Sequence, residues 1–469
     1  MIILSFAFFL ILFVAIGLLS ALKSKSTNKD YLVAGRSVKP WLAALSAVST
    51  NNSGYMFIGQ IGFTFVQGLS SIWLMIGWVT GDLIMSFIVH KKFREVSEKR
   101  GSLSFGGLVA NWWGEPNKRV RILIGLITIL FLGAYAAAQL KAGGKALNVL
   151  FGWDDSAGVI LGTVMVVAYC FAGGIRASIW TDAAQSFVMI GAMSTLFVYA
   201  LAEMGGVSSF IDQLYQVSDT YMNVFPTGLS AGPIAGPALF VFGWLFAGFG
   251  IVGQPHIMIR MMTLDDPKSL TRFRSYYYFW YIAFYIAAIG VGLCSRLILG
   301  DVGGFDPELA LPRLSQELLP DLLVGMMLAG IFAATMSTAD SQILSCSAAL
   351  TRDIFSSKPS NIVTKIGTVS VAVVALVIAL FGSQNVFQLV LMSWSILGAA
   401  FAPILVIYAF GFKIYEKTLF AMILGSIGMV LIWRALGYSS AIYEIAPGIL
   451  TGIGIYFVSR FFSGQGAKV

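Results

Sequence analysis

The sequence has few charged residues, three cysteines and only two histidines. Charged residues make up 11% of its 469 residues, whereas about a quarter are charged in an average soluble protein. So little charge cannot cover a surface that faces water without large apolar patches, which excludes a soluble globular protein. The 58% hydrophobic content and the 50 glycines are typical of helices that pack closely in lipid. We therefore expect an all-α polytopic membrane protein.

The cysteines and histidines form no metal-binding or catalytic pattern. Cys170, Cys294 and Cys346 lie far apart in apolar stretches, so neither a disulfide framework nor a zinc site is expected. His90 and His256 are distant from the cysteines and from each other. A membrane-embedded enzyme would need a nucleophile with its base, or a metal cluster, at membrane depth. We therefore expect no enzyme, no catalytic residue and no cofactor.

Apolar segments of about 18 residues or more recur along the chain and mark candidate transmembrane helices. Thirteen are predicted, near residues 2–21, 40–66, 70–89, 121–149, 156–173, 179–202, 236–259, 275–299, 321–350, 362–381, 386–412, 418–435 and 443–462. The first begins at Met1 with no basic residue before it, and Lys23 and Lys25 follow it. A cleavable signal peptide has the opposite charge order. We interpret this segment as a retained helix whose N-terminus is outside.

The basic residues support this orientation. If successive spans cross the membrane in opposite directions, most of the 30 Lys and Arg residues fall in cytoplasmic loops. The loops at 203–235 and 300–320, on the other side, are acidic. This distribution follows the positive-inside rule and predicts a cytoplasmic C-terminus. The loops are too short for a second folded domain. We expect a multi-pass protein of a bacterial plasma membrane.

The second predicted span is interrupted near its midpoint by six small or polar residues, STNNSG at 49–54. Such side chains bind backbone groups locally and mostly favour the helix poorly. In hydrocarbon every backbone polar group must be satisfied. One or two such residues could be a contact between helices, but six in a row favour a broken helix that lines a site.

The ninth predicted span places small and hydroxyl side chains on one helical face. Ala334, Ser337, Thr338 and Ser341 recur at the spacing i, i+3, i+4, i+7. Two hydroxyls facing free carbonyls of an unwound segment would form an all-oxygen site, which suits a hard cation such as sodium. A stripe of Ser and Thr alone is more often a helix contact. Its pairing with the interrupted second span favours the ion site.

Three acidic residues lie within predicted spans, where an isolated carboxylate is costly and functional by default. Asp340 precedes Ser341 and could supply charge to a cation site. Asp182 is either an ion ligand or a structural partner of Arg176. Asp82 has no polar neighbourhood in the sequence, and we interpret it as a packing or relay residue.

The seventh predicted span is also interrupted. It contains Gly248, Gly250 and Gly253 and then Gln254 and Pro255, and proline removes a backbone donor. Two interrupted spans that lie five spans apart indicate an inverted-repeat secondary transporter with its site at the midplane. A channel would instead need a continuous polar pore, so we treat it, like a membrane enzyme, as a remote alternative.

The predicted organisation follows from these two interruptions. A leading helix and cytoplasmic loop (1–38) precede a first five-helix repeat (39–203) and an extracellular loop (204–235). A second, inverted five-helix repeat (236–413) and two trailing helices with the C-terminus (414–469) follow.

The chain resembles the sodium/solute symporter family. The matching segments lie in order at 31–54, 168–186, 253–262, 333–355, 393–406 and 443–455 and so cover essentially the whole chain. The resemblance implies a leucine-transporter-type fold and alternating-access symport of sodium with a small organic solute. L-proline is the first candidate, and another amino acid, a carboxylate or a sugar is the alternative. Sodium, the solute and the lipid bilayer are the expected partners; nucleic acid is not.

The resemblance also implies site residues. The principal sodium site maps to Ser49 and Asn52, through their backbone carbonyls, and to Ala334, Ser337 and Thr338. A second cation site, used by some members of the family, maps to Asp182, Asp340 and Ser341. The substrate site maps to Asn51, Ser53, Gly54, Tyr55, Met56, Tyr135, Ala247 and Gln254.

Overall fold

The computed structural model describes residues 1–229, 231–301, 303–355, 359–382 and 385–463. Eleven helical stretches in this part of the chain are long and apolar enough to cross a membrane. Two of them, Pro40–Lys99 with 60 residues and Asp155–Glu203 with 49, are too long for one crossing, because about 20 helical residues span the hydrocarbon core. Each provides two crossings, which agrees with thirteen predicted spans.

The chain reverses direction at Gly174, within α10 (Asp155–Glu203), where the backbone has φ +57° and ψ −140°. Gly17 on α1 (Ile2–Ala21) contacts both arms of α10: a Cβ on Gly17 would lie 2.7 Å from Tyr169 Cβ and 2.9 Å from Thr181 Oγ1. In a continuous helix these two residues would be about 18 Å apart along the axis. The two arms of α10 therefore lie side by side. The other reversal follows Gln67, where Gly68 has φ +66° and ψ −142° between α4 (Ile61–Gln67) and α5 (Ile72–Met85).

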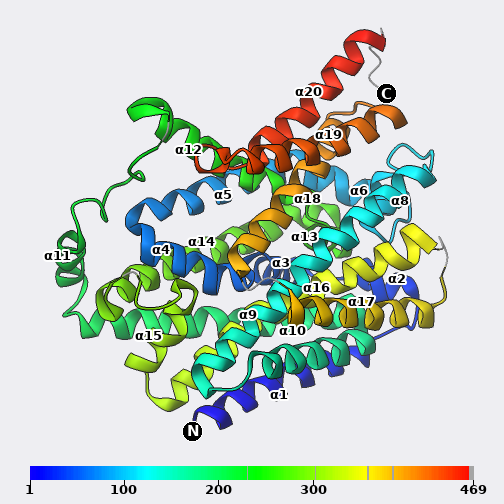
Figure 1. Cartoon of the computed structure of the whole chain (residues 1–469). Helices are drawn as coiled ribbons and strands as arrows, with labels where there is room; N and C mark the ends of the chain where they lie inside the picture. Colours follow the sequence, from blue (N-terminus) through cyan, green and yellow to red (C-terminus); the bar gives the residue numbers. More distant parts are fainter. Residues whose placement is uncertain (230, 302, 356–358, 383–384, 464–469) are drawn as a thin grey trace.

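The remaining helices lie close to their predicted positions (Figure 1). The crossing helices are α3 (Pro40–Gly54), α8 (Lys118–Ile127) with α9 (Gly133–Phe151), α12 (Gly232–Phe249), α13 (Pro255–Thr263), α14 (Leu270–Leu299), α16 (Asp321–Ala348), α17 (Asn361–Phe381), α18 (Val386–Ala409), α19 (Glu416–Ala435) and α20 (Ile445–Ser463). The shorter helices are α2 (Asn28–Val33), α6 (Lys91–Lys99), α7 (Phe105–Val109), α11 (Val207–Val217) and α15 (Ala310–Leu318).

Burial separates central from peripheral helices. The apolar windows of α16 and α18 are each 83% buried inside the protein, whereas that of α1 is 22% buried and those of α19 and α20 are 33% buried. Figure 1 shows α3, α13, α16 and α18 in the middle, with α1 at one edge and α19 and α20 at another. Central helices can carry polar side chains because neighbouring protein, and not lipid, contacts them.

Both predicted interruptions are present. In α3 the backbone breaks at Ser53, which has φ +38° and ψ −177°, and a wide helical turn follows at Tyr55–Gln60. α12 ends at Phe249, and a tight turn at Gly250–Gly253 leads to Gln254, whose extended backbone precedes Pro255 at the start of α13. Each break leaves carbonyl and amide groups without partners in their own helix.

Replacing Gly174 by alanine should destabilise the protein. A side chain at positive φ costs roughly 1–2 kcal/mol, and the added Cβ would collide with the carbonyl oxygen of Tyr31. The melting temperature in detergent, followed by tryptophan fluorescence, should fall. Gly191→Ala, in the same helix and with nothing within 4 Å of the added Cβ, should leave it unchanged or raise it. Equal melting temperatures for the two variants would contradict the reversal at Gly174.

Candidate functional site

The broken end of α3 meets the hydroxyl face of α16. Ser337 Oγ lies 3.2 Å from the carbonyl oxygens of both Ser49 and Ala334. Thr338 Oγ1 lies 2.9 Å from the carbonyl oxygen of Thr50 and 3.1 Å from that of Ala334. All five residues are fully buried. Four residues of the expected sodium site therefore lie together.

Asn52, the fifth residue of the expected sodium site, lies one turn further along α3. Its carbonyl oxygen accepts the amide N–H of Tyr55, and its side chain is fully buried. Among the described hydrogen bonds, Thr50 supplies the second α3 carbonyl to the α16 hydroxyls.

This cluster has the chemistry of a hard-cation site. It gathers two hydroxyl oxygens and three backbone carbonyl oxygens and contains no sulfur or imidazole. The α3 carbonyls lie near the C-terminal end of a helix, where the helix dipole is negative and favours a cation.

Thr50 is a site residue that the sequence analysis did not single out. Its Oγ1 lies 3.1 Å from Ser341 Oγ and 3.3 Å from the carbonyl oxygen of Ser337. Thr50 thus contacts the cluster between α3 and α16 through its carbonyl and a second polar cluster through its hydroxyl. The spacing of Ser46, Ser49, Thr50 and Ser53 at i, i+3, i+4, i+7 is the signal that marks this face of α3.

The second polar cluster contains a buried ion pair. Arg260 on α13 donates from NH2 to Asp182 Oδ2 at 3.0 Å, and neither side chain is exposed. Ser46 Oγ donates to the same carboxylate oxygen at 2.6 Å. The alternative that Asp182 pairs with Arg176 is wrong, because Arg176 pairs with Asp30 at the start of the chain.

Asp340 lies in the same cluster and is surrounded by hydroxyl donors. Its Oδ1 accepts from Ser178 and Ser341, each at 2.8 Å, and its Oδ2 accepts from Tyr169 at 2.8 Å. The three residues expected at a second cation site therefore lie in one cluster, together with the guanidinium of Arg260.

Asp82 is not isolated from polar groups, which corrects its interpretation from the sequence. Its two oxygens accept hydrogen bonds from the hydroxyls of Tyr277 and Tyr278, at 2.8 and 2.9 Å. Asn51 Nδ2 donates to Tyr277 Oη at 2.7 Å. Asp82 is thereby linked to the break in α3, through partners on α14 that lie far away in the sequence.

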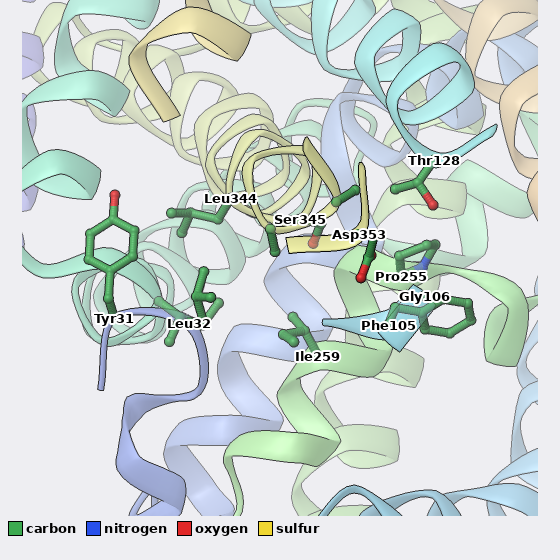
Figure 2. Close-up of a pocket in the computed structure, with 13 residues that line it drawn as sticks. Tyr31, Leu32, Phe105, Gly106, Thr128, Pro255, Ile259, Leu344, Ser345 and Asp353 are labelled. Atoms are coloured by element: carbon green, nitrogen blue, oxygen red, sulfur yellow. The ribbon is translucent and has the colours of Figure 1, made fainter. Parts of the chain in front are cut away.

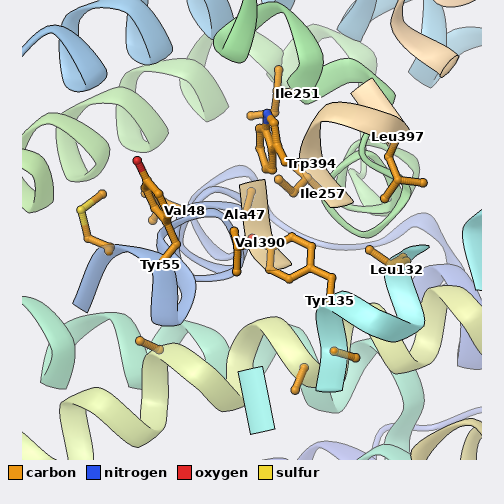
Figure 3. Close-up of a cluster of buried hydrophobic side chains, with 14 of the residues drawn as sticks. Ala47, Val48, Tyr55, Leu132, Tyr135, Ile251, Ile257, Val390, Trp394 and Leu397 are labelled. Carbon is orange, nitrogen blue, oxygen red and sulfur yellow. The ribbon is translucent and has the colours of Figure 1, made fainter. Parts of the chain in front are cut away.

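The expected substrate residues lie beside the two helix breaks (Figure 3). Tyr55, Tyr135 and Trp394 come from three different spans and surround one buried apolar region. Trp394 joins two expected residues of the second break: its Nε1 donates to the carbonyl oxygen of Ala247 at 2.9 Å, and its own carbonyl accepts from Gln254 Nε2 at 3.0 Å. Trp394 is a further residue of this region that was not expected from the sequence.

The other expected substrate residues belong to the first break. The Gly54 amide donates to Gln139 Oε1 at 2.7 Å, and the Tyr55 amide donates to Ser53 Oγ at 3.0 Å. The side-chain amide of Asn51 donates to the hydroxyl of Tyr277. Met56 is 1% exposed and forms part of the apolar core.

Several buried polar atoms near the breaks have no hydrogen-bond partner within the described part of the chain. These atoms are Oδ1 and Nδ2 of Asn52, Nε2 of Gln139, Oε1 of Gln254 and the two ring nitrogens of His256. An unpaired buried polar group costs about 1–3 kcal/mol. These groups would be satisfied by a polar ligand, so the region between the breaks suits a small solute with polar ends.

A pocket lies between α2, α7, α13 and α16 (Figure 2). Its lining includes Tyr31 of α2, Phe105 of α7, Ile259 of α13, and Leu344 and Ser345 of α16. Ile259 belongs to the same helix as Arg260, and Leu344 belongs to the same helix as Ser341, so the pocket and the charged cluster share α13 and α16.

Comparisons of the sequence with known proteins indicate one family. A model of the sodium:solute symporter family matches residues 31–425. The chain is 30% identical over 452 residues to the high-affinity proline transporter PutP of Bacillus subtilis, with 94% of each chain covered. It is 31% identical to sodium/proline symporter 2 of Staphylococcus saprophyticus, with 94% of this chain and 89% of that protein covered.

Solved structures show the fold. A Na+-coupled sialic acid symporter in a substrate-bound outward-open state has a TM-score of 0.85 at 18% identity, over 100% of this chain and 98% of the other. Mhp1, a nucleobase-cation-symport-1 family transporter, has a TM-score of 0.56 at 14% identity, over 94% and 96%. The predicted leucine-transporter-type fold is confirmed.

Replacing Asp182 by asparagine should destabilise the protein by about 3–5 kcal/mol, because it leaves Arg260 as an unpaired buried charge. The matched control is Glu115→Gln, which removes the partner of Lys413 from an ion pair whose glutamate side chain is 74% exposed and whose lysine side chain is 33% exposed. That change should cost less than about 1 kcal/mol. Thermal unfolding in detergent would compare the two variants, and equal losses would contradict the assigned role of the buried pair.

Proposed function

The chain belongs to the sodium:solute symporter family, and from this membership we propose that it imports L-proline together with sodium. The protein is a sodium-coupled secondary active symporter and not an enzyme. The observation that carries the proposal is the all-oxygen cluster between the broken end of α3 and the hydroxyl face of α16.

In this proposal sodium binds between α3 and α16. The carbonyl oxygens of Ser49, Asn52 and Ala334 and the hydroxyls of Ser337 and Thr338 are its proposed ligands. The contacts of Ser337 and Thr338 with the α3 carbonyls support this assignment. Sodium would exchange hydroxyl–carbonyl hydrogen bonds for ion–oxygen contacts and hold the two helices together.

Sodium binding is coupled to solute binding because both involve the break in α3. A ligand shifts a conformational equilibrium only by its differential affinity for the two states. An ion that fixes the end of α3 against α16 favours the state in which the adjacent solute site is ordered. The coupling is reciprocal and typically amounts to about 1–3 kcal/mol.

The solute is proposed to lie between the two helix breaks. Proline has a compact apolar ring and a charged amine and carboxylate. The rings of Tyr55, Tyr135 and Trp394 offer an apolar wall, and the unpaired polar groups near the breaks offer partners for the charged ends. The names of the bacterial relatives support proline as the substrate.

Alternating access then releases both ligands to the cytoplasm. One net charge that moves inward across about 100 mV gains roughly 2.3 kcal/mol, and zwitterionic proline adds no net charge to this movement. The pocket between α2, α7, α13 and α16 shares two helices with the charged cluster and is the proposed start of the inward path. The two five-helix repeats, 39–203 and 236–413, are the proposed units that repack.

Proteoliposomes that carry the purified protein should accumulate radiolabelled L-proline when an inward sodium gradient is imposed. Ser337→Ala/Thr338→Ala should lower the uptake rate at limiting sodium by about a hundredfold, since each lost contact to a charged ligand is worth roughly 1.5 kcal/mol or more.

The matched control is Thr163→Ala/Ser295→Ala. Among the residues that the structure describes, these two buried hydroxyls bond only carbonyl oxygens of their own helices, those of Val159 and Val291. The control should transport normally. Sodium-driven uptake of a different solute would reject proline but retain the ion site, and uptake without any sodium dependence would contradict the proposal.

We further propose that the N-terminus is outside the plasma membrane and the C-terminus is in the cytoplasm. A C-terminal epitope tag should then be protected in intact cells and accessible to protease in inverted membrane vesicles. The asymmetric distribution of basic loop residues supports this orientation. Cleavage of the tag from outside intact cells would contradict it.

A further inference from the structure

Asp82 lies between the two helix breaks and outside both polar clusters. Its side chain is fully buried on α5. Toward the first break, Tyr277 Oη donates to Asp82 Oδ2 at 2.8 Å and accepts from Asn51 Nδ2 at 2.7 Å. Toward the second break, a Cβ on Gly248 would lie 2.7 Å from the Asp82 amide nitrogen, and α12 ends one residue later. Asp82 is therefore connected to both breaks that enclose the proposed solute site.

Hydroxyl groups, and no basic side chain, contact the Asp82 carboxylate within the described part of the chain. On α14 the hydroxyls of Tyr277 and Tyr278 donate to it, and Tyr281 packs against Tyr277 with ring centroids 5.4 Å apart. α3, α12 and the turn Gly250–Gly253 contain no titratable residue. The groups that touch the carboxylate thus supply hydrogen bonds but no positive charge.

Two groups that can carry positive charge lie further along, in the turn Ser86–His90 and opposite it. Arg274 of α14 donates to the carbonyl oxygen of Ser86 and lies 3.1 Å from Ser86 Oγ, one turn beyond Asp82. His90, two turns beyond Asp82, is buried, and its ring nitrogens have no hydrogen-bond partner among the described residues. A buried carboxylate without a paired cation is costly, so neutralisation of Asp82 requires a bound cation.

A proton suits this place better than a metal ion does. Hard metal ions such as calcium and magnesium usually take about six oxygen ligands or more, and the described contacts of Asp82 offer two hydroxyls. A proton needs one acceptor oxygen and neighbours whose hydrogen bonds can rearrange. Tyrosine hydroxyls meet that need because each can both donate and accept a hydrogen bond.

The hydrogen bonds between Asn51 and Asp82 can run in either direction. When Asp82 is ionised, Asn51 donates to Tyr277 and Tyr277 donates to Asp82, as in the structure. When Asp82 has taken a proton from the medium onto Oδ2, the new O–H donates to Tyr277 Oη. Tyr277 then donates to the side-chain oxygen of Asn51, whose amide group has turned over, and Asn51 Nδ2 is released. The reversal adds one proton and changes no other covalent bond.

Asn51 is placed to pass this change to the solute. Among residues 50–53 only Asn51 retains accessible surface, at 6%, whereas the other three are 0% exposed. Its side chain therefore reaches open space beside the break, where the solute is proposed to lie. A released Nδ2 can donate to a carboxylate of the solute, and a hydrogen bond to a charged group is stronger than a neutral one. Protonation of Asp82 and solute binding thus favour each other, since coupling between two sites is reciprocal.

We propose that Asp82 is a proton-binding site that takes up a proton when the solute binds and releases it when the solute leaves. This inference rests on the proposed solute site and adds a proton to the ligands that bind together there. It gives the two tyrosines different parts. Tyr277 connects the proton site to the break, whereas Tyr278 only orients the carboxylate.

Proton uptake on solute binding tests the proposal. L-proline is added to the sodium-saturated protein in weakly buffered detergent solution, and a pH-sensitive dye reports on the medium. The medium should become more alkaline, because zwitterionic proline releases no proton near neutral pH. The dissociation constant of proline should rise by up to about tenfold per pH unit over the range in which Asp82 titrates. Proline binding without proton uptake anywhere between about pH 5 and 8 would overturn the inference.

Variants assign the proton to Asp82 and the connection to Tyr277. Asp82→Asn resembles the neutral carboxyl group in shape, so it should abolish the uptake and bind proline at all pH values with the affinity of the wild type in acid. Tyr277→Phe cuts the connection to Asn51 and should also abolish the uptake. The matched control is Tyr278→Phe, which removes the other hydroxyl from the same carboxylate and should retain the uptake. Uptake that persists in Asp82→Asn, or that is lost equally in both tyrosine variants, would reject the assignment.

Infrared difference spectra of the protein without solute test the proton site separately from the substrate. The difference between acid and alkaline medium should contain a band of a protonated carboxyl group that is absent from Asp82→Asn. Such a band in a protein that does not bind proline would reject the proposed substrate only. Identical spectra for the wild type and the variant would overturn the inference. If Asp82→Asn does not fold, the comparison of Tyr277→Phe with Tyr278→Phe decides.

Discussion

In a membrane, each backbone carbonyl that a helix leaves unpaired must be satisfied by another protein group or by an ion. α3 leaves such carbonyls because its backbone breaks at Ser53, and the hydroxyl face of α16 contacts them. The contact of Ser337 with Ser49 joins residues 288 positions apart. The proposed ion site therefore forms only when the two halves of the chain are packed together, and the other features of the centre are arranged around this contact.

The charged cluster extends the same constraint toward α10 and α13. Buried charges are tolerated when they are paired and hydrogen-bonded. Arg260 contacts residues of four helices and so holds α13 against α3, α10 and α16. Thr50 belongs to both polar clusters, so the proposed sodium site is connected to the charged cluster. The proposed ion site and the packing of these helices thus depend on one connected set of side chains.

Apolar and polar contacts play different parts in the fold. α5 and α12 pack closely because glycines meet at their interface: a Cβ on Gly81 would lie 2.9 Å from Gly248 Cα. Small residues at such an interface let the two helix backbones approach closely. The contact between α3 and α16 instead consists of hydrogen bonds that can be exchanged for ion contacts. Alternating access needs contacts of this second kind, because they must form and break in each cycle.

The sequence alone determined the class of protein, the number of spans and the positions of both helix breaks. These features are local, since a bilayer crossing requires about 20 consecutive apolar residues and a break requires only neighbouring polar or glycine residues. The tertiary structure decided which group faces each buried charge. Arg260 lies 78 positions from Asp182, and Tyr277 lies 195 positions from Asp82. Partners so distant are chosen by helix packing, because a buried charge is satisfied by whatever group the fold brings within hydrogen-bond distance.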